Sequence, residues 1–231
     1  MSAKLASIIL PVYNQEDHIG EVLEEYVSGL QGLPLPFEIL PVINGPRRDC
    51  SLQVCEVLES RFACIRTLCI DRGGWGRAVR FGLSKAQGDL LCYTNSARTS
   101  SRDLLLALVY GSIHDDTVIK ANRKIREGPR RRVGSLLYNL ECRFLFDLPY
   151  WDINGTPKVF SRKLSRLLEL NRDDDLIDLE FNIICRNQGY PVIELPIFSS
   201  KRHSGESTTS LTSAFKMYHG AWQLRKALAK S

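Results

Sequence analysis

A polar corner at residues 94–98, Thr-Asn-Ser-Ala-Arg, follows the apolar run at residues 90–93. The run predicts a buried strand, and ligands of open α/β sheets bind beyond the carboxyl ends of the strands. The corner holds no carboxylate: Asn95 offers one neutral oxygen and Ala97 offers none, which argues against a tightly held Mg²⁺ or Mn²⁺. Arg98 brings positive charge instead, either to a ligand or to solvent.

Four more arginines, Arg47, Arg48, Arg72 and Arg77, lie on the neighbouring predicted loops. A guanidinium forms two parallel hydrogen bonds with phosphate oxygens and stays charged at any working pH. This chemistry makes one or two of these arginines candidates for pairing with the phosphate of a ligand.

A basic run at residues 123–132 contains six lysines and arginines and one glutamate. Such a run suggests a phosphate ligand, nucleic acid or an anionic membrane surface, or else a solvated loop. Stacking aromatic residues are not interleaved with it, so nucleic acid is the weaker alternative.

Strand and helix patterns alternate along the chain, which is typical of a mostly parallel sheet covered by helices. Strands are expected at residues 7–12, 37–43, 65–70, 90–93, 117–120, 155–160 and 192–197. Helices are expected at residues 17–30, 51–61, 102–112, 133–147, 162–169, 178–187 and 212–230, and after the glycine-rich turn at 72–76. The sequence thus predicts one α/β domain over residues 1–231. The apolar face of its last helix either packs on the core or rests on a membrane.

Composition indicates the size of the core, the redox compartment and the relation of the protein to membranes. The 231 residues are 44% hydrophobic, enough for a substantial core, and carry a formal net charge of +5. The seven cysteines form no C-x-x-C pair and several lie inside apolar runs, so a reducing compartment is expected. The N-terminal run has no signal-peptide cleavage pattern, and no run approaches the roughly 20 apolar residues needed to cross a bilayer. We therefore expect a cytoplasmic protein, soluble or peripheral on the inner face of the membrane.

Five motifs occur in a recognisable order: SIILPVYNQEDHI, VINGPRRDCS, DRGGWGRAVRFGLSKAQGDLLCYTNSA, DINGTPKVF and RHSGES. Together they resemble family 2 glycosyltransferases, which are inverting enzymes with a GT-A fold, over residues 5–207. The likeness is strongest to the branch of dolichyl-phosphate mannose synthase and its bacterial polyprenyl-phosphate relatives. It implies a nucleotide-sugar-binding half at residues 5–115, an acceptor-binding half at 116–210 and a C-terminal amphipathic helix at 211–231.

The resemblance implies a set of donor-binding residues. The loop that holds the base in relatives matches Pro11, Tyr13, Asn14 and Glu16, and the end of the second strand matches Asn44 and Gly45. Relatives usually read Asp-Asp-Gly-Ser at that strand end, so Ile43 puts their base preference in doubt. The remaining donor positions are Arg72, Gly73 and Gly76 in the glycine turn, Asn95 and Ala97 at the Asp-x-Asp position, and Gly205 and Ser207 in a closing loop.

The acceptor positions implied by the resemblance are Arg123, Arg131, Ser135, Asp152 and Lys158. The acidic run at residues 173–180 matches the region that supplies a catalytic base in many relatives, and Asp178 is the candidate. A base is needed for a hydroxyl acceptor but not for a phosphate, whose oxygen is already anionic. Capping of a helix N-terminus by an aspartate of this run is the competing explanation.

The sequence as a whole predicts sugar transfer with inversion from a nucleotide diphosphate donor, most simply to a polyprenyl phosphate. Arg98 and Arg202 are the expected stabilisers of the leaving diphosphate, and metal dependence is doubtful. Two alternatives stay open: transfer to a soluble hydroxyl acceptor, and a non-catalytic relative that binds nucleotide or serves as a partner subunit.

Overall fold

The structure is a computed structural model that describes residues 4–96, 99–124, 129–198 and 211–228. The described residues form one seven-stranded sheet in the order β3-β2-β1-β4-β6-β5-β7. The strands are β1 (Ala6–Val12), β2 (Phe37–Asn44), β3 (Leu68–Ile70), β4 (Leu90–Tyr93), β5 (Val118–Arg123), β6 (Lys158–Ser161) and β7 (Val192–Ile197). Every pairing is parallel except those of β6, which runs antiparallel to β4 and β5. The predicted α/β class is therefore confirmed.

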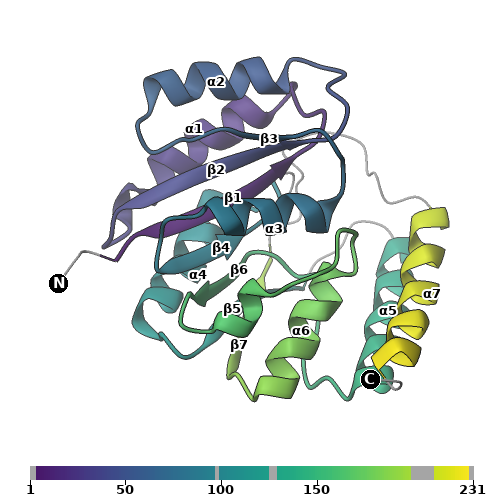
Figure 1. Ribbon diagram of the computed structural model, residues 1–231. Coiled ribbons are helices and arrows are strands. Elements are labelled where there is room, and N and C mark those ends of the chain that lie inside the picture. The colour runs from purple at the N-terminus through teal and green to yellow at the C-terminus, as the bar shows by residue number, and fades with distance from the viewer. Residues whose placement is uncertain (1–3, 97–98, 125–128, 199–210, 229–231) are drawn as a thin grey trace.

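Helices connect the strands and cover both faces of the sheet (Figure 1). The α-helices are α1 (Ile19–Gly29), α2 (Ser51–Arg61), α3 (Trp75–Lys85), α4 (Ser101–Ile113), α5 (Pro129–Phe146), α6 (Ile177–Gln188) and α7 (Leu211–Leu228). Two short 3₁₀ helices are η1 (Leu30–Gly32) and η2 (Ser165–Leu168). None of the helices in the described part of the chain is long and apolar enough to cross a membrane.

Alternation along the strands divides the core into two layers. Ile8 and Leu10 of β1 pack with apolar side chains of α1, α2 and α4, whereas Ile9 between them packs with those of α3 and α6. Successive side chains of a strand point to opposite faces, so a strand buried on both faces is mostly apolar, and the one polar residue of β1, Ser7, donates to Glu38 Oε1 at 2.6 Å. All seven residues of β1 are buried accordingly.

Five elements differ from the sequence prediction in type or by three residues or more at one end. Strand β6 begins at Lys158 instead of residue 155, α5 begins at Pro129 instead of residue 133, and β5 ends at Arg123 instead of residue 120. The third strand, expected at residues 65–70, is only Leu68–Ile70, with Ile65 forming a single bridge to Ile39. The helix expected at residues 162–169 is the single 3₁₀ turn η2. The third strand and η2 lie at the margin of the fold, where few neighbours stabilise a longer element.

A third packing unit joins α5, α6 and α7. Tyr138 of α5 and Tyr218 of α7 meet edge to face with ring centroids 5.6 Å apart, and the Tyr218 hydroxyl donates to the Gly134 carbonyl at 2.6 Å. Ala221 of α7 is fully buried in this unit. The pair α5 and α7 lies side by side at one end of the molecule (Figure 1).

Candidate active site

Asn44 ties three elements together at the carboxyl ends of β1 and β2. Its Nδ2 donates to the Val12 carbonyl at 2.9 Å, and its Oδ1 accepts from the Gly74 backbone N–H at 3.2 Å. Gly45 follows with φ +84°, and a Cβ there would lie 3.1 Å from both Gly73 Cα and the Tyr13 ring. Glycine is required at such a position because L side chains rarely adopt positive φ and the space is already filled.

The loops after β1, β2 and β4 are joined by a chain of hydrogen bonds. The Ser96 hydroxyl of the polar corner donates to Gln15 Oε1 at 2.6 Å, and the Gln15 backbone N–H donates to Ser51 Oγ at 2.7 Å. Ser51 in turn donates to Asp49 Oδ2 at 2.8 Å. The polar corner and the predicted base loop thus form one rigid frame, held by short side chains that donate and accept locally.

The four predicted base-loop residues take different positions in this frame. Pro11 is buried within β1, and Asn14 Oδ1 accepts from the Arg48 backbone N–H at 3.3 Å. Glu16 accepts from the Cys50 backbone N–H at 2.7 Å, so its carboxylate organises the loop after β2. Tyr13 is 39% exposed, which leaves its ring accessible for stacking on a base.

The glycine turn at residues 72–76 packs against the loop that precedes α6. A Cβ on Gly76 would lie 2.4 Å from the Arg172 carbonyl oxygen, which explains why only hydrogen fits there. Arg77 and Arg80 both pair with the Asp173 carboxylate, at 2.7 and 2.6 Å. Arg77 and Arg80 thus share a single carboxylate, and a role of Arg77 toward a ligand phosphate stays a prediction.

Three of the predicted arginines keep their charge available. Arg47, Arg48 and Arg72 are exposed, and their guanidinium groups form no ion pair within the described parts of the chain. They follow β2 and β3, whose carboxyl ends open at the same edge of the sheet as Asn44. An anionic ligand at this edge would therefore meet positive charge that no carboxylate of the described residues pairs with.

The corner after β4 does not fit a protein-held divalent cation. Mg²⁺ and Mn²⁺ favour carboxylate oxygens, and residues 94–98 contain none. The Thr94 hydroxyl is bonded to the Thr99 hydroxyl at 2.7 Å, and the Ser96 hydroxyl is bonded to Gln15. Among the described residues, no group of three or more His, Cys, Asp or Glu side chains is placed to hold a metal ion.

A buried ion pair between Lys158 and Asp178 lies next to Tyr93, the last residue of β4 before the polar corner. Lys158 of β6 is fully buried and donates to Asp178 of α6, which also accepts from the Tyr93 hydroxyl at 2.9 Å and Trp75 Nε1 at 3.2 Å. Burial lowers the pKa of Lys158, and the charge of Asp178 opposes that shift. Each Asp178 oxygen therefore has a donor, and the residue holds α3, β4, β6 and α6 together.

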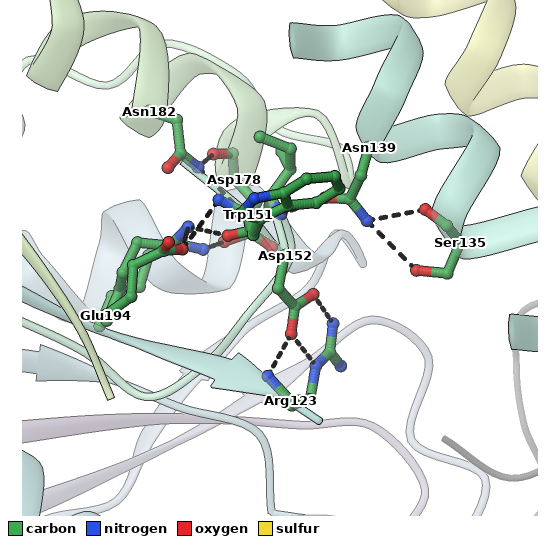
Figure 2. A network of polar contacts seen from close by, with 11 residues as sticks. Arg123, Ser135, Asn139, Trp151, Asp152, Asp178, Asn182 and Glu194 are labelled. Carbon is green, nitrogen blue, oxygen red and sulfur yellow. Dashed lines mark hydrogen bonds and ion pairs between the residues drawn. The ribbon is translucent and has the colours of Figure 1, made fainter. Parts of the chain in front are cut away.

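Two further ion pairs continue this buried network (Figure 2). Arg123 donates through Nε and a terminal nitrogen to the Asp152 carboxylate, both at 2.7 Å, so two predicted acceptor residues pair with each other. Lys120 of β5 donates to the Trp151 carbonyl at 2.5 Å and to Glu194 of β7 at 3.2 Å. Burial is the largest cause that lowers the pKa of Lys120, to about 8, and Glu194 opposes it.

Ser135 lies beside this network on α5. Asn139 Nδ2 donates to the Ser135 carbonyl at 2.7 Å, and Asn139 Oδ1 accepts from the Ile153 backbone N–H at 2.7 Å, next to Asp152. Figure 2 shows Ser135, Asp152 and Arg123 in one region. Lys158 of β6 is in register with Lys120 of the neighbouring β5, which also contains Arg123.

The acidic run at residues 173–180 divides into paired and unpaired carboxylates. Asp174 accepts from the Leu176 backbone N–H at 3.2 Å just before α6, but the N-cap residue of α6 is Leu176, whose side chain makes no capping hydrogen bond. The structure therefore does not show an aspartate of this run capping α6. Asp175 makes no hydrogen bond or ion pair with the described part of the chain, and its residue is exposed. Desolvation by neighbouring atoms raises the pKa of Asp175, and the charges of Asp178 and Asp174 raise it further.

Several predicted site residues lie outside the described part. These are Ala97, Arg98, Arg202, Gly205 and Ser207, together with the side chain of Arg131. Their roles remain predictions from the sequence.

Sequence reasoning missed Lys120, Glu194, Tyr93 and Trp75 as members of the network. A signal was present, because β5, β6 and β7 each carry one charged residue inside an apolar run: VIK, KVF and VIEL. In the sheet, Lys120 is in register with both Lys158 and Glu194. Which strands are neighbours depends on the antiparallel β6, which the order of motifs does not reveal.

Comparisons with known proteins identify the family of the chain and its fold. A family model described as Glycosyl transferase family 2 matches residues 7–168. The undecaprenyl-phosphate 4-deoxy-4-formamido-L-arabinose transferase of Sodalis glossinidius (strain morsitans) is 23% identical over 214 residues, which cover 91% of this chain. The chain spans 64% of that relative's length.

Solved structures share the fold. Glucosyl-3-phosphoglycerate synthase from Mycobacterium tuberculosis in complex with Mn²⁺, UDP and phosphoglyceric acid is similar with a TM-score of 0.72 and 15% identity, over 97% of this chain and 78% of that one. The same enzyme in complex with Mg²⁺ and UDP is similar with a TM-score of 0.69 and 14% identity, over 97% and 79%. The predicted GT-A fold is confirmed, and because the family model covers well over half of its residues, the chain belongs to glycosyl transferase family 2.

Proposed function

We propose that the protein transfers a sugar from a nucleotide diphosphate donor to a polyprenyl phosphate. The observation that carries the proposal is the frame at the carboxyl ends of β1, β2 and β4, which leaves the Tyr13 ring exposed at the edge of the sheet where Arg47, Arg48 and Arg72 follow β2 and β3 without an ion pair to any described residue. An aromatic ring next to unpaired guanidinium groups suits a base joined to a diphosphate.

The state of Asp178 supports a phosphate acceptor. Its carboxylate is buried, ion-paired to Lys158 and bonded to Tyr93 and Trp75, so it is not available to remove a proton from a hydroxyl. An acceptor phosphate is already anionic at neutral pH and needs no base. The name of the Sodalis relative, an undecaprenyl-phosphate sugar transferase, points to the same acceptor class.

The proposed reaction is one displacement with inversion. An oxygen of the acceptor phosphate attacks the anomeric carbon of the donor sugar, and the bond from that carbon to the diphosphate oxygen breaks with its electron pair. Charge then builds on the leaving diphosphate, where positive side chains stabilise it most. Arg72 is proposed for this role from its position, and Arg98 and Arg202 from the sequence alone.

A hydroxyl acceptor is the second candidate, and one observation favours it. Asp175 is exposed, unpaired within the described chain and has a raised pKa, which are the properties of a general base. If the acceptor is a hydroxyl, Asp175 and not Asp178 is the residue to remove its proton.

The test is a transfer assay with a panel of UDP- and GDP-sugars and undecaprenyl phosphate in detergent, with EDTA present, following lipid-linked product by mass spectrometry. The proposal predicts product from one donor, with Asp175→Asn as active as the wild type. Product formed only from hydroxyl acceptors, and lost in Asp175→Asn, would support the second candidate. Nucleotide binding without transfer to any acceptor would identify a non-catalytic relative.

A further inference from the structure

Helix α5 carries two apolar faces, and only one of them is covered. Tyr138, Cys142 and Leu145 are buried against α6 and α7. On the opposite side lies an exposed stripe, defined here as Val133, Leu136, Leu137, Leu140 and Phe144. Apart from the adjacent Leu136 and Leu137, successive members are three or four positions apart, the spacing of a single helix face, and their exposure runs from 47% at Leu140 to 87% at Phe144.

Two tryptophans flank the exposed stripe. Trp222 of α7 is 50% exposed and approaches the Glu141 carboxylate on one flank. On the other flank, Trp151 is 40% exposed, and the Arg143 guanidinium stacks 4.1 Å from its ring centroid. Tryptophan favours the boundary between lipid headgroups and acyl chains, because its ring is apolar and its N–H is polar.

The positive charge of α5 and α7 favours an anionic partner for the exposed stripe. Helices α5 and α7 contain seven arginines and lysines and one acidic residue, a formal charge of +6, whereas the rest of the chain has 24 basic and 25 acidic residues. The net positive charge of the protein therefore belongs to this helix pair. A second copy of the chain would bring like charges together, whereas a bilayer with anionic headgroups is complementary to the pair.

We propose that the exposed stripe of α5, flanked by Trp151 and Trp222, docks the protein on an anionic lipid bilayer. The proposal deepens the proposed function and rests on it, because a polyprenyl phosphate presents its phosphate at the bilayer surface. Ser135, a predicted acceptor residue, lies on the same helix as the stripe. Docking through α5 would bring the acceptor half of the protein to the membrane, in the plane of the headgroups.

The test is sedimentation of the full chain with vesicles of phosphatidylcholine and phosphatidylglycerol in a three-to-one ratio. The triple variant L136S/L140S/F144S should lose binding by roughly tenfold or more, because three large apolar side chains no longer enter the bilayer. The matched control V57S/I113S removes exposed apolar residues of α2 and α4 and should bind like the wild type. Replacing Arg225 and Lys226, both exposed on α7, by glutamate should weaken binding to these vesicles but not to pure phosphatidylcholine.

Equal vesicle binding by the triple variant and the wild type would overturn the proposal. So would a wild-type dimer, measured by analytical ultracentrifugation, that the triple variant converts to a monomer while neither protein binds vesicles. Transfer to a short-chain, water-soluble prenyl phosphate separates this proposal from the proposed function. Transfer without vesicle binding would reject only the docking surface, whereas vesicle binding without transfer to any prenyl phosphate would reject only the acceptor.

Discussion

At the carboxyl ends of β2 and β3, Arg47, Arg48 and Arg72 are exposed and unpaired within the described chain, whereas under β5 and β6 the lysines are buried against carboxylates. The two regions use charge for different purposes. In the donor half, neutral hydrogen bonds such as those of Asn44 and Ser96 hold the frame, and the cations remain for a ligand. In the acceptor half, opposite charges neutralise one another and hold the sheet to α6.

The difference teaches that a charged residue at a family motif is not by itself a ligand-binding residue. Arg123, Asp152 and Lys158 match acceptor positions in the family, yet each is bonded to another protein group. A buried charge must be paired, since an isolated one is too costly to hold in the interior. In the structure these three residues are held by protein groups, and their acceptor role stays a prediction.

The largest expected effect comes from breaking the buried pair. Lys158→Met leaves Asp178 without its cation and should lower the free energy of unfolding by about 3–5 kcal/mol. The matched control is Lys163→Met, which removes an exposed lysine paired with Asp115 and should leave the free energy of unfolding essentially unchanged. Urea denaturation measures both. If both variants lost the same free energy of unfolding, the buried pair would stabilise the protein no more than an exposed one, which contradicts the account.

A smaller effect is expected where the donor frame meets the loop before α6. Gly76→Ala would place a methyl group 2.4 Å from the Arg172 carbonyl oxygen. The resulting overpacking should cost about 1–3 kcal/mol and weaken nucleotide binding. Gly134→Ala on α5, where no atom lies within 4 Å of the added Cβ, should be neutral or slightly stabilising. If Gly76→Ala kept full stability and affinity, the close packing of the glycine turn would not be needed.

The buried charges also predict a dependence on pH. Lys120 has a pKa of about 8 in the folded protein against 10.5 for an ordinary lysine, so between these values the unfolded chain binds more protons. Stability from this group therefore rises as pH increases through that window. We compare the free energies of unfolding of the wild type and of Lys120→Met at each pH. The wild-type value minus the variant value should increase by about 1–2 kcal/mol between about pH 8 and about pH 9.5. Parallel curves for the two proteins would show that Lys120 does not titrate there.

The smallest expected effect is the loss of nucleotide affinity when Arg72, which has no ion-pair partner among the described residues, is replaced. Arg72→Ala should weaken binding of a nucleoside diphosphate roughly fivefold, about 1 kcal/mol, without changing stability, because the guanidinium has no ion-pair partner among the described residues. Arg80→Ala, whose guanidinium is held by Asp173, is the control and should leave the affinity unchanged. The distinction between free and committed arginines would be wrong if both variants had the same affinity.

The sequence alone predicted the parts of the molecule that depend on local pattern. The alternating strands and helices, the glycine turn and the loops after β1 and β2 all follow from periodicity and motif order, and the sheet confirms them. It could not predict pairings between segments distant in the chain. Arg77 with Asp173 and Lys158 with Asp178 depend on how α3 and β6 meet α6, which no short pattern specifies. The exposed stripe of α5 was also hidden, since an apolar helix gives no sign of which side is covered.

The central claim is that the donor half binds a nucleoside diphosphate through arginines in place of a carboxylate-held metal. Isothermal titration calorimetry of the full chain with UDP and with GDP, each in Mn²⁺ and in EDTA, tests it most directly. The account predicts that one of the two nucleotides binds with the same affinity in both buffers. Binding that appears only with Mn²⁺ would contradict it.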